Sequence, residues 1–271
     1  MLGKLIKHEF AATWRIPVAL EILIIILGIT ASISISFIPH IEDSMGTSII
    51  FFMLMGICYV GVIAANIVTI VYLVIRYYKN LYSPQGYLTF TLPVRTESII
   101  ITKVISGSVW MLLSYLSTFL ALIIVGFGAL GQTEITVSQF QEAMGELNSL
   151  FGIFGPRLLL SVLFTVIVSA IGGVLAMYFC VSVGQLWAKH KILGAVFTYI
   201  AVYIFNQIAS VVTFFTSGFF GMAAKSAEEY DNAFAAMYCD MLTKIGMVVL
   251  VESIICFIVC LVITRKKVNL D

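Results

Sequence analysis

Charged side chains are scarce in this sequence. Asp, Glu, Lys and Arg make up 11% of its 271 residues, and 15 basic against 14 acidic residues leave a formal net charge of +1. Apolar residues reach 61% and the mean hydropathy is +1.08, far above the values of soluble domains of this length. The composition excludes a soluble globular protein and predicts an integral membrane protein.

Residues for metal or nucleotide chemistry are also sparse. The only histidines are His8, His40 and His190, which are scattered over a terminus and loops, and neither an H-E-x-x-H nor a C-x-x-C pair occurs. No G-x-x-x-x-G-K-[ST] loop is present to cradle the phosphates of ATP. We therefore expect no metal site, no catalytic residues, no enzymatic activity of the chain by itself and no nucleic-acid partner.

The cysteines do not suggest a disulfide framework. Cys239 stands alone outside the apolar runs, and the other four lie inside them: Cys58, Cys180, Cys256 and Cys260. Nothing in this usage requires an oxidising compartment.

Long apolar runs are abundant. Each is long enough to cross a hydrocarbon core of roughly 30 Å. An all-α, polytopic fold with six spans is therefore predicted, as one transmembrane domain over residues 1–271. The predicted spans are Pro17–Ile38, Ser48–Ile75, Val104–Leu130, Leu158–Trp187, Ile192–Phe220 and Ile245–Thr264.

The segments outside the spans have their own patterns. Residues 1–16 place an apolar face opposite a basic one, which is typical of an amphipathic helix lying in the lipid interface. Residues 131–156 and 217–244 are acidic. Thr136 and the apolar stripe after it predict a short amphipathic helix before the fourth span.

Basic residues indicate the orientation. They fall on one side of the predicted spans, apart from Arg157, Lys225 and Lys244. Because cytoplasmic loops carry the excess of Lys and Arg, both termini are expected in the cytoplasm of a multi-pass cell-membrane protein. The acidic segments are then outer loops.

Residues 76–103, between the second and third predicted spans, combine polar residues, aromatics and two prolines. Ser83 followed by Pro84 predicts an N-cap and the first position of a short helix. That helix should end at Leu92, because Pro93 disfavours the α conformation in the residue before it. The pattern predicts a helix, a break and a second helix at a membrane surface.

The aromatic residues of this segment have two possible roles. Tyr82, Tyr87 and Phe90 could simply anchor the chain at the interface, as we expect of Tyr77 and Tyr78. A capped helix bounded by prolines is more than an anchor needs, so binding of a partner protein is favoured.

Residues 87–94, which read YLTFTLPV, resemble the cytoplasmic loop of six-span permease subunits of ATP-binding cassette exporters of the type-2 class. In that family the loop holds a coupling helix that docks into a separate ATPase subunit, where ATP and Mg bind. Pro84 and Gln85 stand where the family often has acidic residues. The residues that the resemblance assigns to the ATPase contact are Tyr82, Ser83, Tyr87, Leu88, Phe90, Leu92 and Pro93.

The resemblance implies ATP-driven export. Two cytoplasmic ATPase subunits and a second permease subunit, either a copy or a different chain, are the implied partners beside membrane lipid. Amphipathic peptides, lipids and hydrophobic drugs all remain compatible as substrates. Two alternatives stay open: an ion-coupled secondary transporter that uses Glu252, and a membrane anchor or sensor that transports nothing.

Polar residues within the spans are candidates for the substrate path. Glu252 lies well inside the sixth span, and an intramembrane carboxylate is costly enough to suggest a function. The alternative is a packing role, in which Glu252 is protonated or hydrogen-bonded to one of four span amides: Asn66, Asn206, Gln207 or Gln185. Glu21 is expected to reach the interface. The amides that could line the path, or bond between helices, are Asn66, Asn206 and Gln207.

Small residues repeat every four positions in the first span. Gly28, Ser32 and Ser36 form the small-xxx-small pattern that lets two helices approach closely. The pattern predicts packing either within the subunit or against a second permease subunit, and both remain open.

Overall fold

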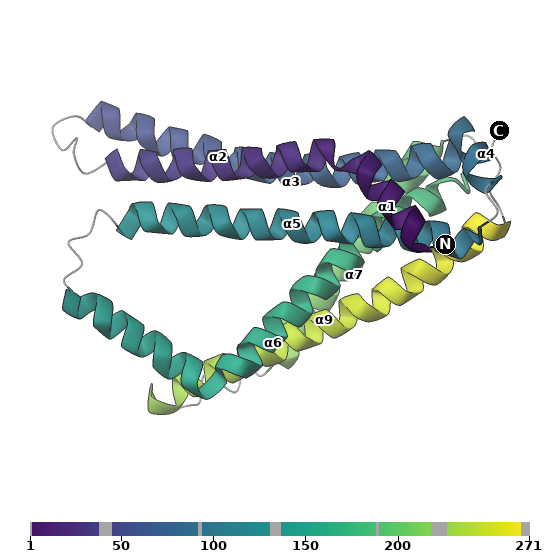
Figure 1. Ribbon diagram of the computed structural model, residues 1–271. Helices are drawn as coiled ribbons and strands as arrows, with labels where there is room; N and C mark the ends of the chain where they lie inside the picture. Colours follow the sequence, from purple (N-terminus) through teal and green to yellow (C-terminus); the bar gives the residue numbers. More distant parts are fainter. Residues whose placement is uncertain are drawn as a thin grey trace. The chain divides into compact units, whose positions relative to one another are not determined.

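The computed structural model describes residues 2–37, 45–91, 94–130, 137–187, 190–217 and 227–266. Helices account for the regular structure of these residues, and no strand occurs among them (Figure 1). The helices are α1 (Leu2–Thr13), α2 (Arg15–Phe37), α3 (Met45–Tyr82), α4 (Pro84–Phe90), α5 (Thr96–Leu130), α6 (Val137–Gly184), α7 (Lys191–Thr216) and α9 (Ala227–Lys266).

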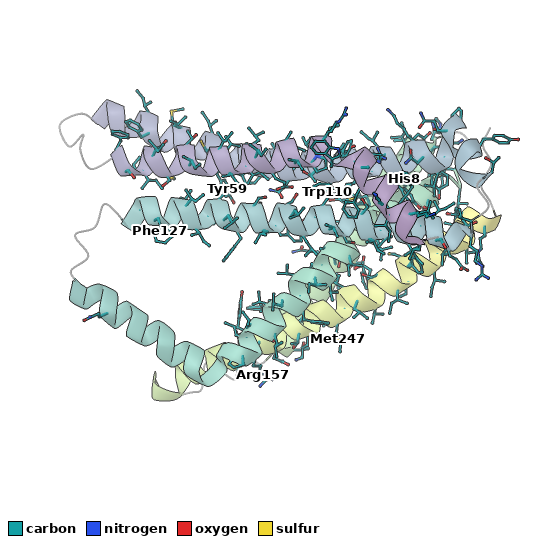
Figure 2. All side chains as sticks on the ribbon, viewed as in Figure 1. His8, Tyr59, Trp110, Phe127, Arg157 and Met247 are labelled. Atoms are coloured by element: carbon teal, nitrogen blue, oxygen red, sulfur yellow. The ribbon has the colours of Figure 1, made fainter. Side chains whose placement is uncertain are left out.

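Six of these helices contain segments long and apolar enough to cross a membrane. The segments are Arg15–Phe37, Ile49–Tyr82, Thr96–Ala129, Gly155–Gly184, Lys191–Thr216 and Ala236–Arg265. Large apolar side chains such as Tyr59, Phe127 and Met247 are exposed on them (Figure 2). Such surfaces suit contact with lipid rather than water. The predicted all-α, six-span fold is confirmed.

Several helices extend beyond the predicted spans. α3 continues to Tyr82 rather than ending at Ile75, because Tyr77, Leu81 and Tyr82 are buried and keep this last part packed. The helix expected before the fourth span is the first part of α6, which runs without interruption through Pro156. Thr136, its expected cap, lies outside the described residues.

A break separates α1 from α2 at Trp14. Pro17 has no backbone N–H to donate to the carbonyl of Thr13, so the helical hydrogen-bond ladder is interrupted there. The Thr13 side chain is buried and accepts a hydrogen bond from the Trp110 indole N–H at 3.2 Å, and Phe10 lies against the same ring. This packing ties the amphipathic N-terminal helix to α5.

The helices form two compact units, each described here by itself. The N-terminal unit comprises the described parts of residues 3–73 and 109–145, and the C-terminal unit those of residues 74–108 and 146–271. In the N-terminal unit, α2, α3 and α5 meet at the buried side chains of Ile24, Ala65 and Ala121.

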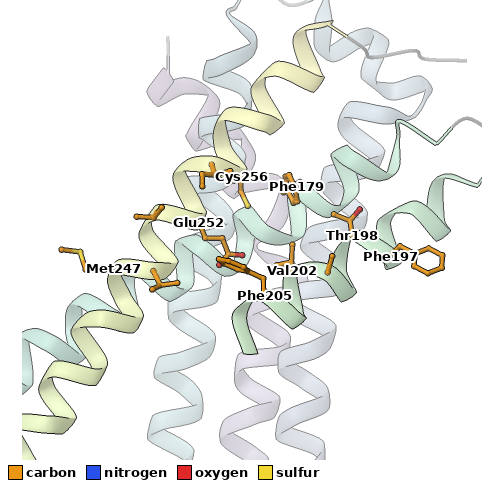
Figure 3. A pocket seen from close by; sticks show the side chains of 12 residues that line it. Phe179, Phe197, Thr198, Val202, Phe205, Met247, Glu252 and Cys256 are labelled. Carbon is orange, nitrogen blue, oxygen red and sulfur yellow. The ribbon is translucent and has the colours of Figure 1, made fainter. Parts of the chain in front are cut away.

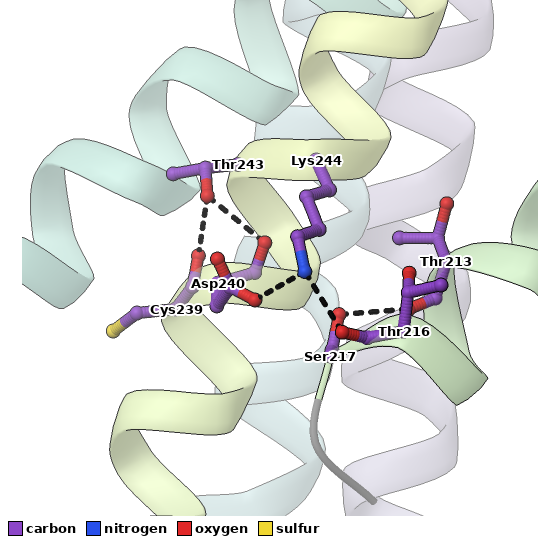
Figure 4. A network of polar contacts seen from close by, with 7 residues as sticks. All are labelled: Thr213, Thr216, Ser217, Cys239, Asp240, Thr243 and Lys244. Atoms are coloured by element: carbon purple, nitrogen blue, oxygen red, sulfur yellow. Dashed lines mark hydrogen bonds and ion pairs between the residues drawn. The ribbon is translucent and has the colours of Figure 1, made fainter.

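In the C-terminal unit, close approaches join α6, α7 and α9. Gly172 lies under Val249 of α9, where an added Cβ would come within 2.4 Å of a Val249 methyl group. At the end of α7, the Lys244 ammonium donates to the Thr216 carbonyl at 3.0 Å and pairs with Asp240 at 2.7 Å (Figure 4). A cation at a helix C-terminus offsets the partial negative charge of its free carbonyls. α6 is therefore packed closely against α9, and α7 is linked to α9 at this end.

Candidate functional site: a capped surface helix and a membrane cavity

The short helix α4 follows α3 directly, and Ser83 is the cap between them. Ser83 has extended backbone angles, and its hydroxyl accepts the Gln85 N–H at 3.4 Å while Pro84 occupies the first helical turn. The Gly86 N–H donates to the Ser83 carbonyl at 2.7 Å. The predicted start of this helix is therefore confirmed.

The end of α4 differs slightly from the prediction. The helix ends at Phe90, with Thr91 as its C-cap, rather than at Leu92. Leu92 and Pro93 lie outside the described residues, as do the side chains of Leu88 and Phe90. Of the aromatic residues assigned to a partner contact, Tyr87 is the one that the structure places at the surface, with 66% of its side chain exposed.

Tyr82 and Tyr77 are not at the surface. Their exposed fractions are 6% and 1%, and both hydroxyls bond to the buried Ser182 of α6, at 2.9 and 3.1 Å. Tyr82 also bonds to Thr264 of α9 at 3.2 Å, and the Tyr77 ring stacks on Tyr178 with centroids 3.9 Å apart. We call Tyr77, Tyr82, Tyr178, Ser182 and Thr264 the tyrosine cluster.

The tyrosine cluster corrects two sequence-based expectations. The expected contact between Tyr82 and an ATPase is wrong for this conformation, because the ring is enclosed by the chain itself. The expected interfacial position of Tyr77 is wrong for the same reason. A period-3.6 pattern shows which residues share a helix face, but not whether protein or lipid covers that face.

The tyrosine cluster joins the end of α3, and so the start of α4, to α6 and α9. A further link lies nearby in the chain, where Glu97 near the start of α5 pairs with Arg265 near the end of α9. Hydrogen bonds between fully buried groups hold their helices in one arrangement more strongly than exposed pairs do. The end of α3, from which α4 begins, is therefore bonded to two other helices of the C-terminal unit, α6 and α9. We call this end of α3 the base of α4.

A second feature of the same unit is a cavity of about 880 Å³ between α6, α7 and α9 (Figure 3). Glu252 of α9 lies in its wall. The Glu252 carboxylate accepts a hydrogen bond from the Asn206 amide of α7 at 3.0 Å. The other residues that line the cavity are mostly apolar: Phe179, Phe197, Thr198, Ala201, Val202, Phe205, Met247, Val248, Val251, Ile255 and Cys256.

The structure separates the four candidates for a substrate path. It brings Asn206 into hydrogen-bonding contact with Glu252, which lines the cavity, although Asn206 itself is not one of the lining residues. Gln207 is exposed and is not among the residues that line the cavity. Asn66 belongs to the N-terminal unit, where its amide donates to Thr118 at 3.0 Å and to the Val62 carbonyl at 2.9 Å. Interhelical packing accounts for Asn66.

Glu21 makes interhelical contacts that the sequence analysis missed. It was expected to reach the interface, but its carboxylate accepts hydrogen bonds from the hydroxyls of Ser114 and Ser117 on α5. Both serines are buried. The signal in the sequence was weak, because these hydroxyls lie far along the chain and serines are common in apolar helices.

The small-residue stripe of α2 packs against α5 of the same chain. An added Cβ on Gly28 would lie 2.8 Å from that of Ala121, and the Ser32 hydroxyl would be 2.3 Å from a Cβ added to Gly128. The Ser36 hydroxyl donates to the Gly128 carbonyl at 3.4 Å. The stripe therefore packs within the subunit, as one of the two alternatives predicted, and packing against a second permease subunit stays a prediction.

Among the described residues, no group of three or more His, Cys, Asp and Glu side chains is placed to hold a metal ion. Comparison of the chain with protein-family models, curated proteins and solved structures finds no match.

Proposed function

We propose that this chain is the membrane-spanning permease subunit of an ATP-driven exporter, and that it forms part of the translocation path and couples to a separate ATPase subunit. The observation that carries the proposal is α4. It is a capped helix of seven residues between the second and third spans that presents Tyr87 outward. A short helix with a rigid base and an exposed aromatic residue suits docking into a partner protein.

The proposed orientation puts α4 in the cytoplasm together with both termini. Basic residues favour the cytoplasmic side of a membrane protein, and several lie at or near helix ends of the C-terminal unit. The described ones at or near the ends of α3, α5, α7 and α9 are Arg76, Lys79, Arg95, Lys191, Arg265 and Lys266. The ion pair between Glu97 and Arg265 supports this arrangement, because it requires the start of α5 and the end of α9 to lie at one end of the unit.

The proposed mechanism passes through the tyrosine cluster. A displacement of α4 by the ATPase would be transmitted to the end of α3. There Tyr77 and Tyr82 bond to Ser182 of α6, and Tyr82 also bonds to Thr264 of α9. These two helices also form walls of the Glu252 cavity. Tyr178 stacks on Tyr77, and the next residue, Phe179, lines the cavity. A rigid-body shift of α3 would therefore reshape the cavity directly.

The ATPase subunits would bind ATP and Mg, whereas this chain supplies the docking helix and the path. The test is an affinity purification of the tagged chain from its native membrane in mild detergent. We expect a co-purifying subunit with a phosphate-binding loop, and ATP hydrolysis by the purified complex. Absence of any such subunit under conditions that preserve other membrane complexes would contradict the proposal.

One alternative has a specific observation in its favour. The pairing of Asn206 with Glu252 at a cavity is also what an ion-coupled transporter could use. Reconstituted vesicles distinguish the two functions. Flux that follows an ion gradient without ATP would favour the ion-coupled transporter, whereas flux that requires ATP and the partner subunit would favour the exporter.

A further inference from the structure

We propose that the Glu252 cavity binds a lipophilic organic cation, a molecule with a permanent or protonated positive charge enclosed by apolar groups. The inference deepens the proposed function by naming a substrate class, and it rests on that function only for the use made of binding. Binding itself needs neither ATP nor a partner.

The size and lining of the cavity favour an organic molecule. About 880 Å³ lies in the range of small-molecule sites, and the wall consists mainly of aromatic and aliphatic side chains. Phe205, Val251 and Ile255 are all more than half exposed. A lipophilic ligand would therefore meet an accessible apolar wall.

The charge on the wall has one sign. Glu252 carries the carboxylate, and none of the described lining residues is Lys, Arg or His. The Glu252 carboxylate accepts a hydrogen bond from Asn206, whose amide also donates to the Val202 carbonyl at 3.1 Å. Both N–H hydrogens of the Asn206 amide are thereby used. The Glu252 carboxylate has about four acceptor sites and receives this one hydrogen bond from a neutral donor. A bound cation would offset the cost of a carboxylate at low dielectric.

The wall suits an organic cation better than an inorganic ion. Metal cations such as Ca²⁺ take six to eight oxygen ligands, but Glu252 and Thr198 are the oxygen-bearing side chains of the lining, and the Thr198 hydroxyl already donates to the Gly194 carbonyl at 2.8 Å. Phe179 and Phe205 are aromatic residues of the same lining as Glu252 (Figure 3). Aromatic faces together with a carboxylate recognise cations that carry little hydration.

The test uses two ions of the same shape and opposite charge. Tetraphenylphosphonium and tetraphenylborate are measured for binding to the purified chain in phosphatidylcholine nanodiscs, with empty nanodiscs subtracted. We expect saturable binding of the phosphonium at least about tenfold tighter than that of the borate, because the wall carries a carboxylate and no basic residue. Equal binding of the two would overturn the proposal and indicate a site for neutral lipid chains.

The central variant is Glu252→Gln, and Glu21→Gln is its matched control. Both remove one intramembrane carboxylate, but Glu21 belongs to the N-terminal unit, accepts hydrogen bonds from two serines and does not line this cavity. Glu252→Gln should weaken phosphonium binding about tenfold, while Glu21→Gln should stay within about twofold of the original chain. Unchanged binding in a folded Glu252→Gln chain would contradict the inference.

A second variant covers the case in which Glu252→Gln does not fold. Phe205→Leu keeps the carboxylate but removes a ring, and should weaken phosphonium binding about threefold, whereas Phe127→Leu in the N-terminal unit should not. Equal effects of Phe205→Leu and Phe127→Leu on phosphonium binding would contradict a binding site at the Glu252 cavity. Loss of ATPase co-purification with phosphonium binding intact would overturn the proposed function alone, so the two proposals fail separately.

Discussion

The C-terminal unit holds two sets of polar residues in opposite environments, one buried and fully bonded and the other bordering an open cavity. In the tyrosine cluster, the rings of Tyr77 and Tyr82 are almost completely buried and each hydroxyl bonds to a residue of another helix. At the cavity, Glu252 bonds to Asn206 and otherwise borders a largely apolar, open space. Both sets lie inside candidate membrane spans, where polar groups are costly.

The difference separates polar groups that hold helices together from those that can serve a ligand. A buried hydroxyl with every bond made within the chain gains nothing from a further partner, so its contribution is rigidity. A carboxylate with one neutral donor keeps the capacity to bind something else. In the proposed exporter the first set would transmit motion and the second would meet the substrate.

The largest expected difference concerns ring removal. Tyr77→Ala should lower the free energy of unfolding by about 3 kcal/mol, because its stacked and enclosed ring leaves a cavity. Phe205→Ala at the membrane cavity should cost under about 1 kcal/mol, because that ring is 54% exposed and lipid can refill the space. Thermal melting of the two variants in the same detergent measures this. Equal losses of stability in the two variants would contradict the distinction between the tyrosine cluster and the cavity.

A smaller difference is expected when single polar groups are removed. Tyr82→Phe keeps the ring but leaves Ser182 and Thr264 without their bonds to it, which should cost about 1 kcal/mol. Tyr78→Phe, on the exposed face of the same helix, is the matched control and should melt with the original chain. Identical melting temperatures for Tyr82→Phe, Tyr78→Phe and the original chain would show that the tyrosine cluster does not stabilise the unit.

The smallest effect should be confined to α4. Ser83→Ala removes the N-cap, which should destabilise this helix by about 1 kcal/mol and speed amide exchange at Gln85 about fivefold. Ser83→Asn restores a capping side chain and should largely restore protection. Protection of α4 unchanged by Ser83→Ala would mean that the base, not the cap, decides whether the helix forms.

Local patterns were enough for the spans and for the start of α4. Uninterrupted apolar runs predict membrane helices, and the Ser83–Pro84 pair predicts a helix start, because each depends on residues close in sequence. The extension of α3 to Tyr82 could not be predicted, since it depends on burial against Ser182, about 100 residues later. The true partners of Glu21 were missed for the same reason.

The cavity itself was not predicted, and the sequence offered only candidates for a substrate path. Asn206 was one of four amides considered as a partner of Glu252, and which of them faces it depends on the relative rotation of α7 and α9. Periodicity gives the face of one helix, whereas a pair across two helices needs the packing of both. Gly28, Ser32 and Ser36 show the same limit, because the pattern predicts close packing without identifying the partner helix.

The measurement that tests the central claim most directly is the yield of ATPase subunit co-purified with Tyr87→Ala, compared with Tyr78→Ala. Both replace an exposed tyrosine, but only Tyr87 belongs to α4. If α4 is the docking helix, Tyr87→Ala should lose most of the ATPase while Tyr78→Ala retains it, and both chains should insert into the membrane normally. Equal ATPase yield from the two variants would contradict the account.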